Sequence, residues 1–193
     1  MNIGATAETG FGLYFGWGEK TGHALTAAAA GSIFDGTIIS DAFEGTHSFS
    51  SPYPTIDGST QDPTTLPASN DAATVNWGAG WRIPTGNEGE FKALNDNTTN
   101  AWTDNYNSTG VKGRTFTGKN ETPDYSDITL FFPAAGVGNT TSLYSAGTSG
   151  NYWSSTLYSS TNAYRLSFSG ITVSPQDSNI GRYYGFSVRP VSD

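Results

Sequence analysis

The sequence predicts an α+β fold in which two short helices lie around small antiparallel sheets, within one loop-rich domain spanning residues 1–193. Charged residues make up only 13% of the chain and 24 of its 193 residues are glycine, a composition typical of loop-rich proteins with sheets and not of helical bundles. Alternating apolar and polar residues predict strands, and two capping patterns predict helices. A chain of this length can bury a core of its own.

The N-terminal third contains one predicted strand and one long irregular segment. Residues 11–19, FGLYFGWGE, are aromatic and glycine-rich, which predicts a short strand with its backbone close to aromatic rings. Glu19 is expected to accept a structural hydrogen bond. At about residues 20–67, four prolines and many turn-forming residues predict an irregular insertion. An insertion of that length is either functional or mobile.

The first predicted helix covers residues 71–76. Ser69 or Asn70 can serve as its N-cap, because both side chains can accept hydrogen bonds from the first free backbone N–H groups. Gly78 and Gly80 follow and are expected to end the helix.

The second predicted helix covers residues 90–94. Thr85 and Glu88 have the spacing of a capping box that opens it, and Phe91 with Leu94 would form its buried side. Glu88 and Glu90 have the residue type of a catalytic carboxylate pair, but two positions apart on a helix they point in different directions. The capping role is therefore the preferred interpretation for Glu88.

The middle of the chain is expected to hold loops on either side of one core strand. Residues 95–107 are rich in Asn, Asp and Thr, which predicts a loop around the anchor Trp102. Residues 127–132 predict a core strand ended by Pro133. Residues 136–150 are glycine-rich and predict a flexible loop.

Residues 151–191, called the display segment below, have the composition of a binding surface. They hold 5 of the 10 tyrosines and 9 serines but no Lys and no Glu, and Asp177 is the single Asp. Tyrosine supplies rigid contact area and serine adaptable hydrogen bonding, as in antibody loops. Along residues 163–169, apolar and polar side chains alternate, so one face would pack and the other stay free. An ordinary half-buried strand with a serine-rich solvent face would show the same alternation.

We expect ligand contacts from the outward strand face and from the adjoining turns. Tyr and Arg should contribute most to binding, because they dominate interface hot spots. Replacing Tyr183 and Tyr184 together is expected to abolish binding with little loss of stability. The predicted contact residues are Tyr158, Asn162, Arg165, Ser167, Ser169, Asn179, Tyr183 and Tyr184.

Several short motifs occur in a fixed order and carry a family resemblance. They are YFGWGE at 14–19, DAATVNWG at 71–78, WRIPT at 81–85, FPAAG at 132–136, YWSS at 152–155 and GFSVRPV at 185–191. Together they resemble the signature of the Fibrobacter succinogenes major paralogous domain, common in gut Bacteroidetes and their phages. That family is similar to the formylglycine-generating-enzyme branch of C-type-lectin-like folds. The resemblance spans nearly the whole chain and implies a C-type-lectin-like fold, with the YWSS and VRPV motifs in its scaffold.

Relatives with this C-terminal layout include the variable proteins of diversity-generating retroelements, whose last segment is rewritten by adenine-directed mutagenesis. Mutating the adenines of Asn codons cannot yield Gln, Lys, Glu, Met or Trp. Residues 1–150 contain 16 of these, a rate that predicts about 4 in the display segment, which contains two, Trp153 and Gln176. The lower count agrees in direction with diversification. Trp153 lies within a scaffold motif, so Gln176 is the residue that disagrees.

The resemblance implies a non-enzymatic ligand- or receptor-binding module: a retroelement-diversified variable protein in a phage tail, on the virion, or displayed on a bacterial cell surface. Its partner would be a cell-surface protein or a glycan receptor. The alternative is a non-diversified structural or adhesive surface domain of a gut bacterium. In the family, a segment like residues 2–5 follows a first strand, so a preceding N-terminal region is expected, and it could form a homo-oligomer.

Composition and the family's chemistry argue against other functions. The enzymatic relatives are oxidases with active-site cysteines, and this chain has no Cys, so no such activity and no cofactor is expected. His23 and His47 are expected to be exposed loop residues rather than a zinc pair. A net charge of −8 with scattered basic residues disfavours nucleic acid, and no apolar run is long enough to insert in a membrane. A hydrolase using loop carboxylates, and calcium binding by Asn/Asp loops, remain the alternatives.

Overall fold

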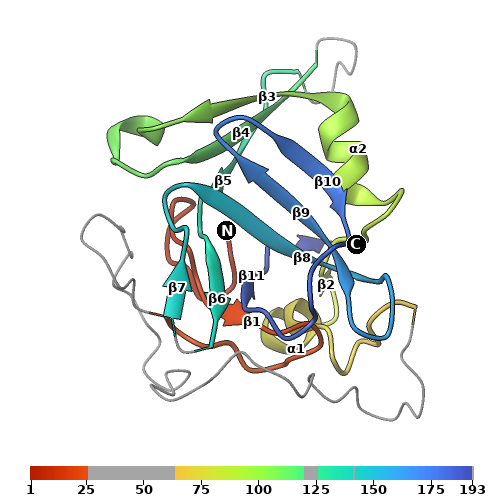
Figure 1. The fold of residues 1–193 in the computed structure, drawn as a ribbon. Coiled ribbons are helices and arrows are strands. Elements are labelled where there is room, and N and C mark those ends of the chain that lie inside the picture. Colours follow the sequence, from red (N-terminus) through yellow and green to blue (C-terminus); the bar gives the residue numbers. More distant parts are fainter. Residues whose placement is uncertain (26–63, 120–125, 141, 193) are drawn as a thin grey trace.

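The computed structural model describes residues 1–25, 64–119, 126–140 and 142–192, and Figure 1 shows their arrangement. This part of the chain is mostly β with two helices and several small sheets, in agreement with the predicted α+β class. Most of the predicted insertion at about 20–67, including His47, lies outside the described residues.

A five-stranded sheet forms the centre of the described fold, in the order β1-β11-β8-β9-β10 (Figure 1). Neighbouring strands are antiparallel except β11 and β8, which are parallel. Four of the five strands come from the C-terminal part of the chain, and the short strand predicted within residues 11–19 pairs with the last of them. The strands are β1 (Tyr14–Phe15), β8 (Ser149–Leu157), β9 (Ala163–Ser169), β10 (Val173–Asp177) and β11 (Phe186–Ser187).

A three-stranded antiparallel sheet packs beside it and consists of β3 (Thr98–Thr103), β4 (Gly113–Gly118) and β5 (Thr129–Pro133). β5 confirms the predicted core strand, with Pro133 at its end. The predicted loop over residues 95–107 is wrong, because β3 occupies its middle. The polarity of this threonine-rich segment suggested a loop. Threonine and tryptophan nevertheless favour strands, because their side chains pack well on a half-buried pleated surface.

Two small antiparallel pairs complete the sheets: β6 (Val137–Asn139) with β7 (Ser142–Tyr144), and β2 (Trp81–Arg82) with β12 (Val191–Ser192). The first pair and the start of β8 replace the flexible loop predicted at 136–150, so that prediction is wrong. Strands of three residues give too few positions for an alternating pattern to be visible in the sequence.

The first helix, α1 (Ala72–Trp77), begins one residue later than predicted. Its N-cap is Asp71 rather than Ser69 or Asn70: one carboxylate oxygen accepts hydrogen bonds from the backbone N–H groups of Ala73 (2.9 Å) and Thr74 (3.0 Å). Gly78 ends the helix with a positive φ of 97°, a conformation that favours glycine.

The second helix, α2 (Glu90–Asn97), has Gly89 as its N-cap. The prediction that Glu88 is the capping partner of Thr85 is wrong. Glu90, not Glu88, reaches back: its carboxylate accepts hydrogen bonds from the backbone N–H and the hydroxyl of Thr85, and from Arg82 Nη2 at 2.6 Å. Burial raises the pKa of Glu90, but the hydrogen bonds from Thr85 and Arg82 outweigh it and lower the pKa to about 2. Phe91 is buried and Leu94 packs against the same cluster, as predicted.

Three clusters of buried side chains fill the space between these elements. The first includes Trp17, Trp153 and Phe186, the second centres on Tyr14 and Phe131, and the third fills the space between α2 and the two larger sheets. The third cluster consists of Phe91, Phe116, Phe132, Tyr152, Leu166 and Phe168.

His23 is buried, with 6% of its surface exposed, so the prediction of an exposed loop residue is wrong. Its backbone pairs with that of Tyr14 through two hydrogen bonds of 2.8 and 2.9 Å, which extends β1 by one bridge. Glu19 lies 3.5 Å from the His23 imidazole and accepts a hydrogen bond from the Gly16 N–H at 2.7 Å. The structural role predicted for Glu19 is confirmed.

Candidate ligand-binding surface

The YWSS motif, residues 152–155, forms the buried centre of β8. The Tyr152 hydroxyl donates to the Pro133 carbonyl oxygen (2.7 Å), and Trp153 Nε1 donates to the Phe15 carbonyl oxygen (2.7 Å). Ser155 N donates to the Pro84 carbonyl oxygen at 2.8 Å. This motif therefore ties the central strand to three other parts of the chain and is not available to a ligand.

The VRPV motif, residues 188–191, is held in the same way. The Val188 carbonyl oxygen accepts a hydrogen bond from Ile3 N at 3.0 Å. The Arg189 guanidinium is buried over the ring of Phe132, 5.1 Å from its centroid, and lies 3.9 Å from the Glu8 carboxylate. Both ends of the display segment are thus fixed, and what can face a ligand lies between them.

The two faces of β9 differ as the alternation predicts, but the second face is not free. Leu166 and Phe168 are buried in the third cluster. On the opposite face, Arg165 Nη1 donates to Asn151 Oδ1 (2.9 Å) and Nη2 to Asp177 Oδ2 (2.8 Å). Only 15% of the Arg165 side chain is exposed, and its Cζ lies 5.2 Å from the centroid of Phe186. The prediction of a free face is wrong because β10 pairs with β9 and brings the Asp177 carboxylate to that face.

Asp177 is the shared acceptor of this region. Besides Arg165, its carboxylate accepts hydrogen bonds from Ser167 Oγ (2.9 Å) and from the backbone N–H of Asn179 (3.1 Å). Burial raises the Asp177 pKa, but the Arg165 charge and the hydrogen bonds outweigh it, so the pKa lies below its usual value. Three predicted contact residues are therefore positioned by one group that was not among them. The signal for it in the sequence is that Asp177 is the single acid of the display segment.

Ser169 does not join this group. Its hydroxyl accepts hydrogen bonds from the backbone N–H groups of Ile171 (3.2 Å) and Thr172 (3.3 Å), within the turn between β9 and β10. Ser169 lies two residues from Ser167 on the same face of β9, but its hydroxyl holds this turn rather than bonding to Asp177.

A second group of predicted residues meets at the other end of β9. A backbone bridge joins Asn162 to Gly181, and Asn162 Nδ2 donates to the Ser178 carbonyl oxygen at 3.4 Å. The turn before β9 and the loop after β10 therefore lie against each other. Tyr158, 56% exposed, stands beside this junction with its ring edge-on to Tyr164 at 5.3 Å.

Tyr183 and Tyr184 connect the two groups. Their rings stack at 4.4 Å, and Tyr184 also stacks on Phe186 at 6.4 Å. The ring of Phe186 therefore contacts both the Tyr184 ring and the Arg165 guanidinium. Tyr184 packs against the first core cluster, so it is partly a core residue. Seven of the eight predicted residues lie around the Asp177 cluster and the junction of the turns, and Ser169 lies at the far end of β9, in the turn to β10.

Gln176 has its own role. Its Nε2 donates to the Asn87 carbonyl oxygen (2.7 Å) and to Glu88 Oε1 (2.8 Å), in the turn before α2. The residue that disagrees with diversification therefore fastens the edge strand β10 to the neighbouring turn.

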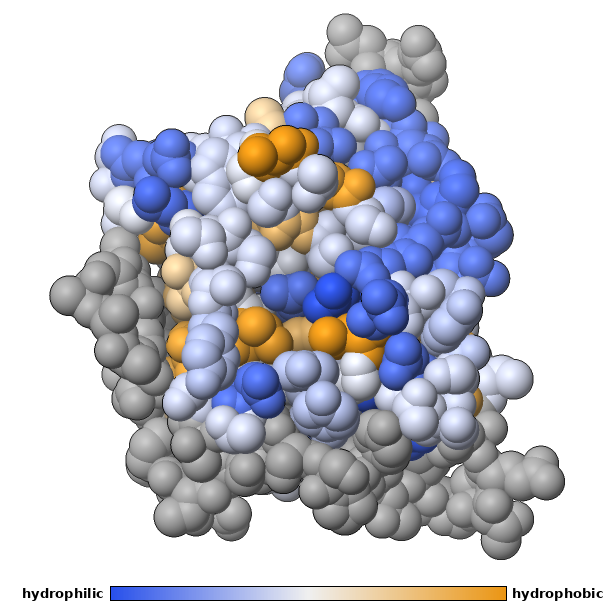
Figure 2. All heavy atoms as spheres, viewed as in Figure 1, coloured by the Kyte–Doolittle hydropathy of each residue, from blue (hydrophilic) through white to orange (hydrophobic). Residues whose placement is uncertain are grey.

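Figure 2 shows the face of the molecule seen in Figure 1. Strongly hydrophilic residues gather near the middle of this face and over the side of α2, and hydrophobic residues lie next to the central group. This face therefore presents a polar centre with apolar surface beside it.

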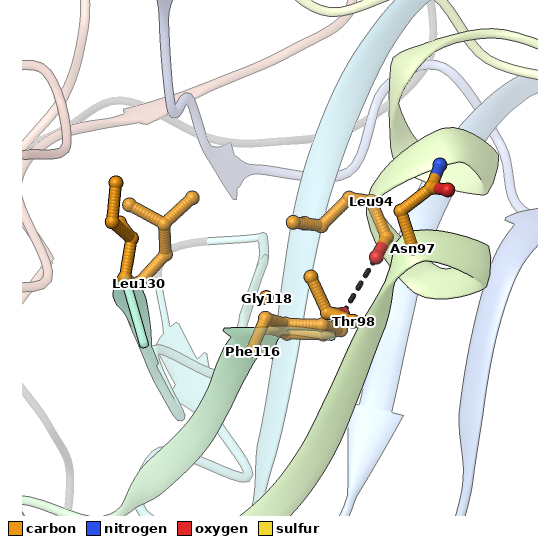
Figure 3. Close-up of a pocket in the computed structure, with 7 residues that line it drawn as sticks. Leu94, Asn97, Thr98, Phe116, Gly118 and Leu130 are labelled. Carbon is orange, nitrogen blue, oxygen red and sulfur yellow. Dashed lines mark hydrogen bonds between the residues drawn. The ribbon is translucent and has the colours of Figure 1, made fainter. Parts of the chain in front are cut away.

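An apolar pocket of about 400 Å³ opens at the end of α2 (Figure 3). Its polar side chains are already used: Thr98 Oγ1 donates to the Leu94 carbonyl oxygen (2.6 Å) and Asn97 Nδ2 to the Ala93 carbonyl oxygen (2.8 Å). Because both side chains bond to carbonyl oxygens of α2, the turns and polar face of the display segment, called the display surface below, are the better candidate site. The pocket is lined by Leu94, Asn97, Thr98, Phe116, Gly118, Ile128 and Leu130.

Within the described ranges no group of three or more His, Cys, Asp or Glu side chains could hold a metal ion. No helix in this part of the chain has the length and apolar character to cross a membrane.

Comparison with known families gives one match. Residues 119–191 fit the model of a family described as "Domain of unknown function (DUF8237)", and they cover β5 to β11 and with them the whole candidate surface. No curated protein and no solved structure matches the chain.

Proposed function

We propose that this chain is a non-enzymatic ligand- or receptor-binding module that recognises its partner through the turns and the polar face of the display segment. The observation that carries the proposal is the division within that segment. Its motif residues at 152–155 and 188–190 are buried, while Arg165, Ser167 and Asn179 are gathered around Asp177. A fixed frame that holds a set of ordered polar and aromatic side chains is what a recognition module requires.

The finer proposal is a C-type-lectin-like fold, serving a retroelement-diversified variable protein of a phage tail or a bacterial cell surface. Support comes from β11, which returns to pair with β1 beside β8, and from two helices beside the sheets. Among the turn residues that a diversified surface would vary, Tyr158 and Asn179 are exposed. The partner would be a surface protein or a glycan receptor, and the assembly could be a homo-oligomer.

Gln176 favours a second candidate, a fixed adhesive or structural surface domain. Adenine-directed mutagenesis of Asn codons cannot produce this residue, and it is bonded to the turn before α2. The encoding gene separates the two candidates. A nearby template copy and an adjacent reverse transcriptase are expected for a variable protein, and a gene without either would leave the fixed adhesive domain.

The test of the proposal is binding of the purified protein to intact gut-bacterial cells and to a glycan array. A variant with Tyr158→Ala, Asn179→Ala and Tyr183→Ala removes side chains from the turns. Tyr144→Ala is the matched control, because Tyr144 is 50% exposed and lies on β7, outside the display segment. Loss of binding in the folded triple variant with full binding in the control is the expected result. Equal binding by both variants would overturn the proposal.

A further inference from the structure

We infer that the display surface takes an uncharged, hydroxyl-rich ligand, a neutral glycan, and that Asp177 sets this preference by neutralising Arg165. The inference rests on the proposed function and adds a ligand class to it. It starts from the charged residues of the display segment, which are three arginines and one aspartate: Arg165, Arg182, Arg189 and Asp177.

Two of the arginines are buried parts of the scaffold. Arg182 is 2% exposed; its Cζ lies 4.8 Å from the centroid of Trp17, and its Nη1 donates to the Ser160 carbonyl oxygen at 2.9 Å. Arg189 is 9% exposed and lies over Phe132 beside Glu8. Neither guanidinium is placed to form a hydrogen bond with a ligand at the surface.

The third arginine is at the surface but is paired. Arg165 donates from both Nη atoms, to Asn151 and to Asp177, and the pair of charges is half-buried, with 15% and 23% of the two side chains exposed. At a distance of 2.8 Å and with partial burial, the two charges cancel for any group approaching from solvent. The surface therefore presents no net charge to its ligand.

An anionic ligand would find no partner here and would be repelled by the rest of the chain, whose net charge is −8. The side chains that remain are aromatic rings, hydroxyls and amides, represented by Tyr158, Tyr183 and Asn179. Aromatic rings with a few placed polar groups bind sugars through ring stacking and hydrogen bonds.

A protein partner fits this surface less well. Within the described display segment the exposed large hydrophobic residues are Tyr158 and Ile171. They lie in the turns at opposite ends of β9, so they form no continuous apolar patch. The centre of a protein interface is normally apolar and depleted in charge, whereas the centre of this surface is a polar cluster around Asp177.

Asp177→Asn is the decisive variant, because it keeps the shape and an accepting oxygen but leaves the Arg165 charge uncompensated. We measure binding of wild type and variants to neutral, sialylated and sulfated glycans at several salt concentrations. Wild type is expected to bind neutral glycans with an affinity independent of salt. Asp177→Asn is expected to gain about tenfold in affinity for sulfated or sialylated glycans, lost again at high salt.

The double variant Arg165→Gln with Asp177→Asn is the control. It has no charge at this position and should show no gain for anionic glycans, whereas a gain caused by structural loosening would persist in it. Preference of wild type for anionic glycans, or an Asp177→Asn variant without the gain, overturns the inference. Binding to cells without binding to any glycan also overturns it but leaves the proposed function standing, provided the turn variants abolish the cell binding. Cell binding unaffected by the turn variants rejects both.

Discussion

The Tyr152 hydroxyl donates a hydrogen bond to the Pro133 carbonyl oxygen at 2.7 Å and so joins the five-stranded sheet to the three-stranded sheet. The same hydroxyl accepts from Asn2 Nδ2 at 3.4 Å, and its ring meets Phe132 edge-on at 5.1 Å. Burial raises the pKa of Tyr152 above its usual value, so the hydroxyl is protonated at neutral pH and acts as a donor.

Replacing Tyr152 by Phe is expected to lower the free energy of unfolding by about 1–3 kcal/mol, because the Pro133 carbonyl oxygen loses its side-chain donor in a dry site. Urea denaturation followed by tryptophan fluorescence measures it. Tyr144→Phe, on an exposed side chain, should leave stability unchanged. A Tyr152→Phe variant as stable as wild type would mean that the hydroxyl does not join the sheets.

Single replacements of Tyr183 and Tyr184 are expected to differ in their cost to stability. From the residues alone, removing both should abolish binding at little cost in stability. Tyr184 stacks on Phe186 and packs on the first core cluster, so Tyr184→Ala should cost about 2 kcal/mol, while Tyr183→Ala should cost much less. Thermal unfolding gives the order, and binding to cells reports the loss of contact. The reverse order of stabilities would contradict the packing described for Tyr184.

Glu90→Gln should destabilise the protein in a pH-dependent way. The folded-state pKa of Glu90 is lowered from 4.5 to about 2, so its stabilisation is present above the unfolded value and is lost as the pH falls toward the folded value. We expect a difference of about 1 kcal/mol near neutral pH, since the side chain is partly exposed. Unfolding free energies of wild type and variant should converge between pH 4.5 and about 2. A difference independent of pH would exclude ionised Glu90 as its source.

Asp71 caps α1 and also accepts a hydrogen bond from the backbone N–H of Ile83 at 2.9 Å. Asp71→Ala removes both, and because the site is 4% exposed, it should cost about 2–4 kcal/mol. Asp71→Asn keeps one accepting oxygen and should cost less than half as much. Chemical denaturation of both variants gives the comparison. Equal losses would show that one accepting oxygen is not enough to preserve the stabilisation.

The sequence predicted the fold class, both helices and the alternation in β9 because these depend on local patterns. It missed β3 and the β6–β7 pair. These strands are short or rich in threonine, so whether they form depends on the segment with which they pair. It also placed the first cap on Ser69 or Asn70. Asp71 is the cap instead, and its second carboxylate oxygen accepts a hydrogen bond from the Ile83 N–H. This contact joins residues twelve positions apart, which capping preferences do not take into account.

The candidate surface is a prediction from the composition of the display segment, which is visible in the sequence. What could not be seen was the pairing of β10 with β9, which sets Asp177 opposite Arg165. An arginine predicted to face solvent thus becomes half of an ion pair. His23, predicted as exposed, is buried for a related reason, because its backbone pairs with Tyr14.

The order of the central sheet places β11 between β1 and β8, so the strand of this sheet that is synthesised last occupies an interior position. β1 has its sheet partner only after residue 187 has been synthesised. At about 5–20 residues per second, β1 is synthesised roughly ten seconds or more before β11. The central sheet therefore closes only after β11 has been synthesised, and a chain terminated before β11 leaves β1 and β8 unjoined.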